Sequence, residues 1–253
     1  MTTNRPAAVA IGRRALLVSA LGVAVLAACA DEKKSSTAAP ADDPRPLTSQ
    51  EAELLALARF RLHQRATVPV DMEWPGTPSA SLAVTLDLHD GVAWGRMSTG
   101  DDDAATDRLV LWDLQAIGTA PSADEAPAPA EWSTRGLSTD VPQDIFLTLA
   151  LTLGSDRPEN PVLLQQSTAQ FLRRDAVGGV ETSVFQGPRP AEETEQRQAR
   201  SRYWVDDEGA LLRFEAYLGD RSGQLARITV TDPHDEVEGL REAAEGVLVA
   251  GRR

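Results

Sequence analysis

The sequence predicts an α+β domain in which helices pack on one face of a curved antiparallel sheet. Three observations predict this class: an amphipathic helix at the start of the domain, a hairpin of alternating apolar residues after it, and a run of strands late in the chain. Two helical segments lie between the two groups of strands. Because helices and strands are grouped rather than alternating, an α+β arrangement is favoured over a parallel sheet.

The domain begins with a helix predicted over residues 49–64. Thr48 and Glu51 have the spacing of a capping box, in which each side chain accepts a hydrogen bond from the backbone N–H of the other residue. Apolar residues then recur at helical spacing: Leu54, Leu55, Ala58 and Leu62.

The first group of strands is a predicted hairpin followed by one further strand. Residues 82–88 alternate between apolar and polar side chains, Asp90-Gly91 is a strong turn signal, and residues 92–97 form the return strand. Residues 108–115 are predicted as another strand, and the Ala- and Pro-rich residues 118–130 as a loop.

Two helices are predicted in the middle of the chain. The first starts after Asp140, the expected N-cap, has Pro142 in its first turn and ends at Gly154. The second is short and starts at Asn160-Pro161. The apolar stripe of the first helix consists of Ile145, Phe146, Leu149 and Leu153.

The second group of strands occupies the last third of the chain. Gly178-Gly179 joins two of the strands, and Gly209 ends a turn that requires a positive φ. A short helical tail is expected after about residue 235. The strands are predicted over residues 169–177, 180–186, 203–205, 210–218 and 225–231.

The N-terminus has the features of an export signal over residues 1–28. Arg5, Arg13 and Arg14 supply positive charge, and an apolar run follows over residues 15–28. That run is shorter than the ~20 residues needed to span a bilayer core. The sequence therefore predicts a signal segment that is removed after export.

Leu26-Ala27-Ala28-Cys29 resembles the lipobox of bacterial lipoproteins. The resemblance implies that Cys29 receives a diacylglycerol and becomes the first residue of the mature chain, anchored to the extracytoplasmic face of the cell membrane. An ordinary buried thiol is the alternative. It is disfavoured because an export signal precedes Cys29 and polar residues follow it, so nothing is available to bury it.

The rest of the chain divides into a tether and one domain. Residues 29–47 lack apolar periodicity and are predicted as a flexible tether, and residues 48–250 as a single α+β domain. Arg13-Arg14 is also similar to a twin-arginine export motif, so both the general and the twin-arginine export routes stay open.

The acidic composition excludes one class of partner. The formal net charge is −13, and loss of the signal, with its three arginines and no acidic residue, changes it to −16. Such a chain repels phosphate backbones, so no nucleic-acid partner is expected. Since there is one cysteine, no disulfide can form within the chain, and its stability must come from an apolar core.

Two late segments resemble lipid-binding lipoproteins: residues 169–182, and residues 203–214 with the turn at Gly209. They are similar to actinobacterial lipoproteins of the LppX/LprG type and to LolA-like periplasmic lipid carriers. The first helix, from Leu47 to Phe60, resembles a further set of lipoproteins that implies no function. The carrier resemblance implies a half-barrel sheet closed by helices over an apolar cavity, which would carry a lipid or another hydrophobic ligand.

Nine apolar residues are the candidates for lining such a cavity. A strongly bent sheet leaves space between its concave face and the helices, and the helices over residues 141–167 would act as a lid. The same residues could fill a solid core, and the domain would then bind a protein partner through its acidic surface or a sheet edge. The candidates are Leu82, Val84, Leu86, Leu88, Trp112, Phe146, Leu149, Leu212 and Phe214.

No pattern typical of catalysis or of a resident metal is present in the sequence. It lacks Gly-x-Ser-x-Gly, a phosphate-binding glycine loop and His-Glu-x-x-His. His63, His89 and His234 are far apart and lack the spacing of metal ligands. We therefore expect no cofactor and a non-enzymatic function.

Overall fold

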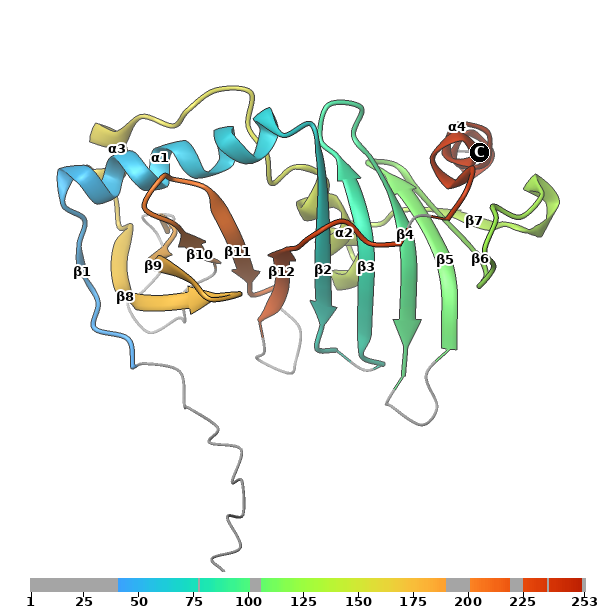
Figure 1. Cartoon of the computed structure of the whole chain (residues 1–253), viewed down its shortest axis with the longest axis horizontal. Coiled ribbons are helices and arrows are strands. Elements are labelled where there is room, and N and C mark those ends of the chain that lie inside the picture. The colour runs from blue at the N-terminus through green and yellow to red at the C-terminus, as the bar shows by residue number, and fades with distance from the viewer. Residues whose placement is uncertain are drawn as a thin grey trace, which may run out of the picture. The chain divides into compact units, whose positions relative to one another are not determined.

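The computed structural model describes residues 41–76, 78–100, 106–189, 201–218, 225–235 and 237–251 (Figure 1). The predicted signal segment, Cys29 and most of the predicted tether lie outside these residues.

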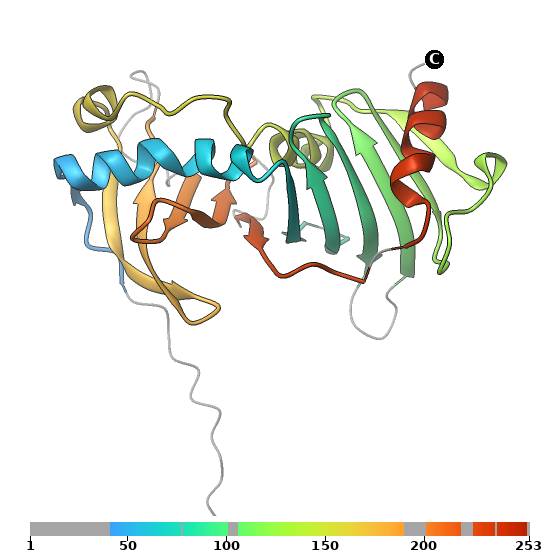
Figure 2. The same cartoon turned by 45° about the horizontal axis from the view of Figure 1, so that its top comes forward.

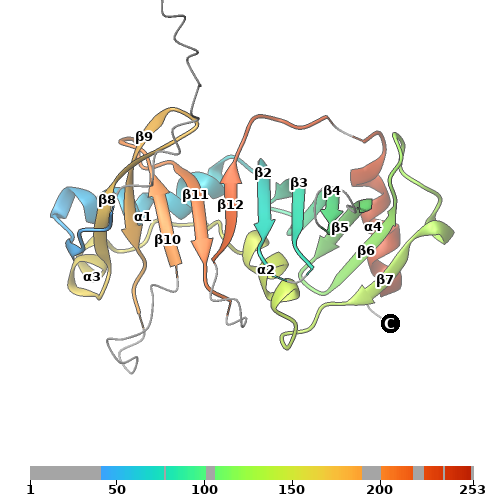
Figure 3. The ribbon, with the colours of Figure 1, turned by 90° about the horizontal axis from the view of Figure 1, so that it is seen from below.

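The strands of the described chain form a single antiparallel sheet that is curved and open (Figures 1 and 3). Its order is β1-β8-β9-β10-β11-β12-β2-β3-β4-β5-β6-β7, so the two groups of strands predicted from the sequence join where β12 pairs with β2. The predicted α+β class with a curved antiparallel sheet is confirmed. The strands are β1 (Arg45–Pro46), β2 (Thr67–Trp74), β3 (Ala80–Asp87), β4 (Val92–Thr99), β5 (Thr106–Asp113), β6 (Ala116–Pro121), β7 (Ser133–Gly136), β8 (Gln170–Val177), β9 (Val180–Gln186), β10 (Ser201–Val205), β11 (Leu211–Ala216) and β12 (Ala226–Val230).

Helices α1 (Ser49–Gln64), α2 (Pro142–Leu151) and α3 (Pro161–Gln166) share one apolar core with the sheet. Helix α1 packs on α3 and contacts β10 and β11, whereas α2 contacts β3 and β5 (Figures 1 and 2). Of the two helices predicted as a lid over residues 141–167, α3 therefore packs on α1, and α2 packs on the sheet.

Helix α4 (Leu240–Gly251) differs from the expectation that all helices pack on one face. It contacts β4, β5, β6 and β7 (Figure 2). On β5, Leu109 and Leu111 belong to the core cluster that includes α4, whereas Val110 and Trp112 belong to the cluster that includes α2. Since alternate residues of a strand point to opposite faces, α4 covers the face opposite α2.

The predicted capping box of α1 is confirmed, and an arginine extends it. Thr48 Oγ1 accepts a hydrogen bond from Glu51 N at 3.3 Å, and Glu51 Oε2 accepts one from Thr48 N at 2.9 Å. Arg45 pairs with the same carboxylate at 2.7 Å. The hydrogen bond from Arg45 is the main cause that lowers the pKa of Glu51 to about 2.

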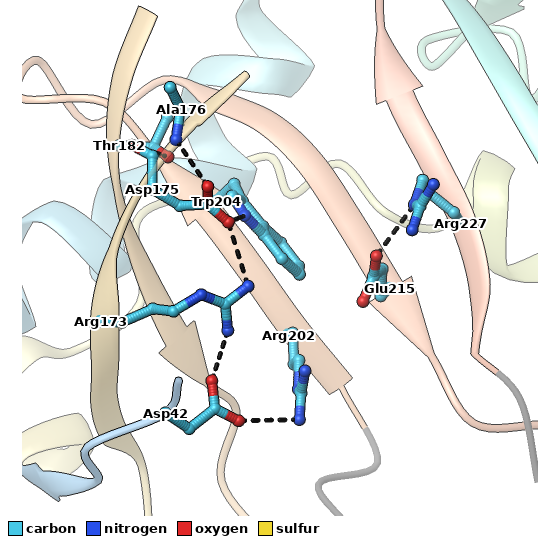
Figure 4. A network of polar contacts seen from close by, with 9 residues as sticks. All are labelled: Asp42, Arg173, Asp175, Ala176, Thr182, Arg202, Trp204, Glu215 and Arg227. Atoms are coloured by element: carbon cyan, nitrogen blue, oxygen red, sulfur yellow. Dashed lines mark hydrogen bonds and ion pairs between the residues drawn. The ribbon is translucent and has the colours of Figure 1, made fainter. Parts of the chain in front are cut away.

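The last residues of the predicted tether, residues 29–47, belong to the folded domain. Asp43 N donates to Leu172 O at 2.7 Å, Arg45 and Pro46 pair with β8, and Leu47 is buried. Asp42 accepts hydrogen bonds from both Arg173 and Arg202 (Figure 4). The end of the predicted tether is therefore part of the sheet edge.

The same network surrounds Trp204 on the sheet face opposite α1 (Figure 4). Trp204 Nε1 donates to Asp175 at 3.0 Å, and the Arg173 and Arg213 guanidinium groups lie 5.6 and 5.7 Å from the indole centroid. Burial raises the pKa of Asp175, but hydrogen bonds from Trp204, Ala176 and Arg173 outweigh this effect and hold the pKa below its ordinary value.

Several elements differ from the sequence-based prediction. Strand β2 was not predicted, although Val68, Val70, Met72 and Trp74 alternate along it and are buried. Strand β6 and the 3₁₀ helix η2 (Pro129–Glu131) fall largely in the predicted loop at 118–130, and β7 was not predicted. The N-cap of α2 is Val141 rather than Asp140, and no side chain caps that end.

The low pKa of Glu51 predicts acid sensitivity. Because the folded pKa is below that of the unfolded chain, the ionised carboxylate stabilises the fold above about pH 4.5, and this contribution is lost as the pH falls toward 2. Glu51→Gln should show a smaller loss of unfolding free energy over this range than the wild type, measured by urea denaturation. Glu53→Gln, at an exposed position of α1, is the control. Equal losses in Glu51→Gln and the wild type would contradict the prediction.

Candidate ligand-binding site

A cavity of about 290 Å³ lies between α2 and the strands on which it packs. Pockets for small ligands usually start at about 300 Å³, so this one has the size for a compact ligand. Its wall is mostly apolar at the sheet and polar near β7 and the start of α2. It is lined by Trp74, Pro78, Ala80, Leu82, Met97, Thr99, Ile117, Thr119, Ser133, Arg135, Gln143, Asp144, Phe146 and Leu147.

Polar contacts hold α2 over the cavity. Trp112 Nε1 donates to Leu147 O at 3.0 Å within the core. The Asp144 carboxylate accepts two hydrogen bonds from Arg135, at 2.6 and 2.7 Å, and a third from Ser138 N at 2.9 Å. The Asp144 side chain is 1% exposed and that of Arg135 is 54% exposed. The hydrogen bond with Asp144 raises the pKa of Arg135.

Trp74 contributes its indole ring to the cavity wall. Its side chain is buried, and its Nε1–H has no hydrogen-bond acceptor in the described structure. The ring lies 6.2 Å from that of Phe146, across the cavity lining. A buried donor without an acceptor costs about 1–3 kcal/mol. Because Nε1 has almost no accessible surface and lies against the Gly76 turn, a ligand in the cavity would contact the ring of Trp74 and not this atom.

The approach of Trp74 to the following turn depends on a glycine. A Cβ atom at position 76 would lie 2.2 Å from Trp74 Nε1, so any other residue would displace the indole. Gly76 therefore allows the ring to fold back against its own chain and to line the cavity.

Two of the nine candidate ligand-binding residues lie on this wall, Leu82 and Phe146. Four others lie in the main core and do not line the cavity: Leu86, Leu88, Trp112 and Phe214. Val84 is a core residue that also borders a different hollow, and Leu149 packs against the main core and borders a third one.

The expected inward direction of Leu212 is wrong. A register shift at the end of β10 pairs Trp204 with Arg213 and Val205 with Leu211, which leaves Leu212 as an extra residue on β11. Such a bulge interrupts the alternation of side chains between the two faces. Leu211 and Phe214 therefore face the main core, whereas Leu212 packs with Trp204 on the opposite face.

The cavity residues that sequence reasoning missed come from elements that it did not predict or use. Trp74 ends β2, whose alternating pattern could have been found. Ile117 and Thr119 lie on β6, where small residues and a glycine hide the pattern. Leu147 lies beside the predicted apolar stripe of α2, and nothing in the helical spacing distinguishes it.

Two further hollows are present in the described structure. One, of about 450 Å³, lies over the small residues Ala83, Thr85 and Gly95, under the segment that leads from β12 to α4. The other, of about 350 Å³, lies on the outer side of α2 between Leu114 and Ile145, which are 50% and 36% exposed. Neither contains a buried unpaired donor comparable to that of Trp74.

Further observations on the described residues concern metal ligands and membrane-spanning helices. No group of three or more metal-ligating side chains occurs among them. His63 and His89, which the sequence places far apart, lie with ring centroids 4.5 Å apart, and His89 Nε2 lies 3.1 Å from His63 O. None of the helices in this part of the chain is both long and apolar enough to cross a membrane.

No model of a known protein family matches the chain, and no curated protein is significantly similar to it. The similarity to lipid-binding lipoproteins therefore stays a prediction from the sequence.

The Arg135–Asp144 pair predicts an asymmetric effect on stability. Arg135→Ala leaves a buried carboxylate without a counter-charge and should lower the free energy of unfolding by roughly 2–3 kcal/mol. Asp144→Ala should cost less, because the half-exposed guanidinium is solvated. Arg174→Ala, which breaks an exposed pair with Asp207, is the control and should cost under about 1 kcal/mol. Urea denaturation measures all three, and a larger cost for Asp144→Ala would contradict the argument.

Proposed function

We propose that this protein is a lipoprotein, anchored through Cys29 to the extracytoplasmic face of the cell membrane, which binds a hydrophobic ligand without covalent chemistry. The observation that carries the binding function is the cavity under α2, with its mostly apolar wall. The lipobox similarity at Leu26–Cys29 supports the anchor.

Binding in this cavity would depend on burial of apolar surface. Trp74, Leu82, Met97 and Phe146 offer apolar contacts, and each buried methylene of a ligand contributes about 0.8 kcal/mol. The polar contacts of Asp144 and Leu147 hold α2 at fixed points, so the ligand would enter beside α2 at its polar end rather than through the core.

A protein partner is the second candidate function. The exposed side chains of Leu114 and Ile145 border the hollow on the outer side of α2, and apolar surface of this kind is typical of an interaction site. This second function would be favoured if the protein, purified from the membrane of the cells that produce it, contained no ligand in the cavity.

The anchor is tested by fatty-acid labelling. Cells that express the full chain are grown with an alkyne-tagged palmitate, and the wild-type protein should become labelled at Cys29. Cys29→Ser should lose the label because the thiol that receives the diacylglyceryl group is gone. Ser35→Ala, a nearby polar position, is the control and should keep the label. A labelled Cys29→Ser protein would disprove the anchor.

The cavity is tested by photo-crosslinking of the full chain in membrane vesicles. A decyl ester that carries a diazirine and an alkyne should label peptides of β2 and α2. Ala80→Phe, which places a ring in the cavity, should reduce labelling at least several-fold. Ala83→Phe is the matched control, because Ala83 lies on the same strand but borders the other hollow. No labelling of cavity peptides, or equal labelling in the two variants, would contradict the proposed function.

A further inference from the structure

Strand β7 is one of the two edges of the sheet, and no strand of the described structure pairs with its outer side (Figure 3). The opposite edge is protected, because β1 is two residues long and ends in Pro46, which has no N–H to donate. Strand β7 contains neither proline nor lysine. It therefore lacks two devices that commonly prevent an edge strand from pairing with another chain.

The register with β6 shows which backbone groups of β7 are free. In an antiparallel pair, residues that bond to the partner strand alternate with residues whose N–H and C=O point away from it. Leu137 N donates to Gln115 O at 2.8 Å, so the backbone groups of Gly136 and Thr134 point away from β6. The Gly136 carbonyl accepts a hydrogen bond from Arg135 Nη1 at 3.1 Å. The Thr134 N–H and C=O and the Gly136 N–H are left for a further strand.

The same alternation places the cavity beside this edge. Ser133 and Arg135 line the cavity under α2. Thr134 lies on the opposite face, where a Cβ atom at Gly251 of α4 would be 3.1 Å from Thr134 Cβ. Side chains of a strand added to β7 would alternate in step with these residues. Its residue opposite Arg135 would therefore point toward the face that carries the cavity.

The cavity wall favours an apolar side chain at that position. Arg135 and Asp144 neutralise each other through hydrogen bonds of 2.6 and 2.7 Å, so the wall near β7 offers no free charge. The wall farther from β7 includes Leu82 and Met97, on β3 and β4. A charged side chain would lose its hydration there without gaining a partner.

A second copy of the chain fits this edge poorly. Pairing of β7 with itself about Arg135 would put two arginines opposite each other, and like charges in this position destabilise a pair of strands. The side chains that β7 itself would direct toward the cavity face, Ser133 and Arg135, are polar. Neither copy would supply an apolar side chain.

We infer that the hydrophobic ligand of the cavity is a side chain of an extended polypeptide segment that pairs with the outer side of β7; this inference rests on the proposed function. The free backbone groups of Thr134 and Gly136 bond to the backbone of the segment. A large apolar residue opposite Arg135, leucine or phenylalanine, enters the cavity. Because β7 has four residues, a short segment is sufficient. The backbone pairing provides affinity, and the apolar residue provides specificity.

The test uses a capped pentapeptide of serine, threonine, photoleucine, threonine and serine that carries an alkyne. It is added to right-side-out membrane vesicles that contain the full chain, and light should crosslink it to peptides of β7 and α2. Methylation of both threonine backbone nitrogens should reduce labelling by about five-fold or more, the value of one hydrogen bond. Methylation of the photoleucine nitrogen, which points away from β7, is the control and should leave labelling unchanged.

A protein variant tests the same contact from the other side. Thr134→Pro removes the free N–H, and proline is tolerated here because this N–H takes no part in the pairing with β6. Labelling by the pentapeptide should fall by about five-fold. Thr139→Pro is the matched control, the same substitution in the loop that follows β7, and should keep the label. The decyl ester should label the cavity in both variants, which shows that the fold is intact.

The outcomes separate this inference from the proposed function. Equal pentapeptide labelling in the two variants, or full labelling by the peptide methylated on its threonines, would overturn the inference. If the decyl ester labels the cavity but the pentapeptide does not, the inference fails and the proposed function stands. If neither probe labels the cavity, the proposed function itself fails. A dimer in native mass spectrometry that Thr134→Pro dissociates would assign the edge to a second copy and would also overturn the inference.

Discussion

The fold depends on the pairing of β12 with β2. This pairing joins the strands that follow α1 to the strands near the end of the chain, with Ile228 opposite Met72 and both side chains almost fully buried. Without it the sheet would be two separate pieces, and the core that α1, α2 and α3 share would be divided. Because the two strands are far apart in the sequence, the contact forms only when most of the chain is present, which is typical of slowly folding β topologies.

The sequence was informative where one short segment determines its own structure. The capping box at Thr48 and Glu51 defines α1, Asp90-Gly91 defines the β3–β4 hairpin, and Gly178-Gly179 defines the β8–β9 hairpin. The sequence was uninformative for β6, because burial on both faces removes the alternation of apolar and polar residues along the strand. The role of α4 was also not predictable, because its apolar stripe does not specify which face of the sheet it covers.

The sequence left a cavity and a solid core open as alternatives, and it identified only part of the cavity wall. The positions of Leu82 and Phe146 are predicted by strand and helix periodicity. Trp74 lines the cavity because Gly76 leaves room for its ring to fold back, and sequence periodicity does not predict such a contact. The prediction for Leu212 failed for a different reason. One extra residue in β11 places its side chain on the face opposite to the one that the alternating pattern predicts. Polar contacts at Asp144 and Leu147 fix the position of α2 above the cavity.

The attachment of Asp42 and Asp43 to the sheet edge (Figure 4) has a consequence for an anchored protein. If Cys29 carries the proposed anchor, thirteen residues separate it from Asp42, and they span at most about 45 Å. An attachment that began only at Thr48 would allow roughly 65 Å. With that anchor, the contacts of Asp42 with Arg173 and Arg202 would shorten the distance that the domain can move from the membrane, and they would raise its effective concentration at that surface.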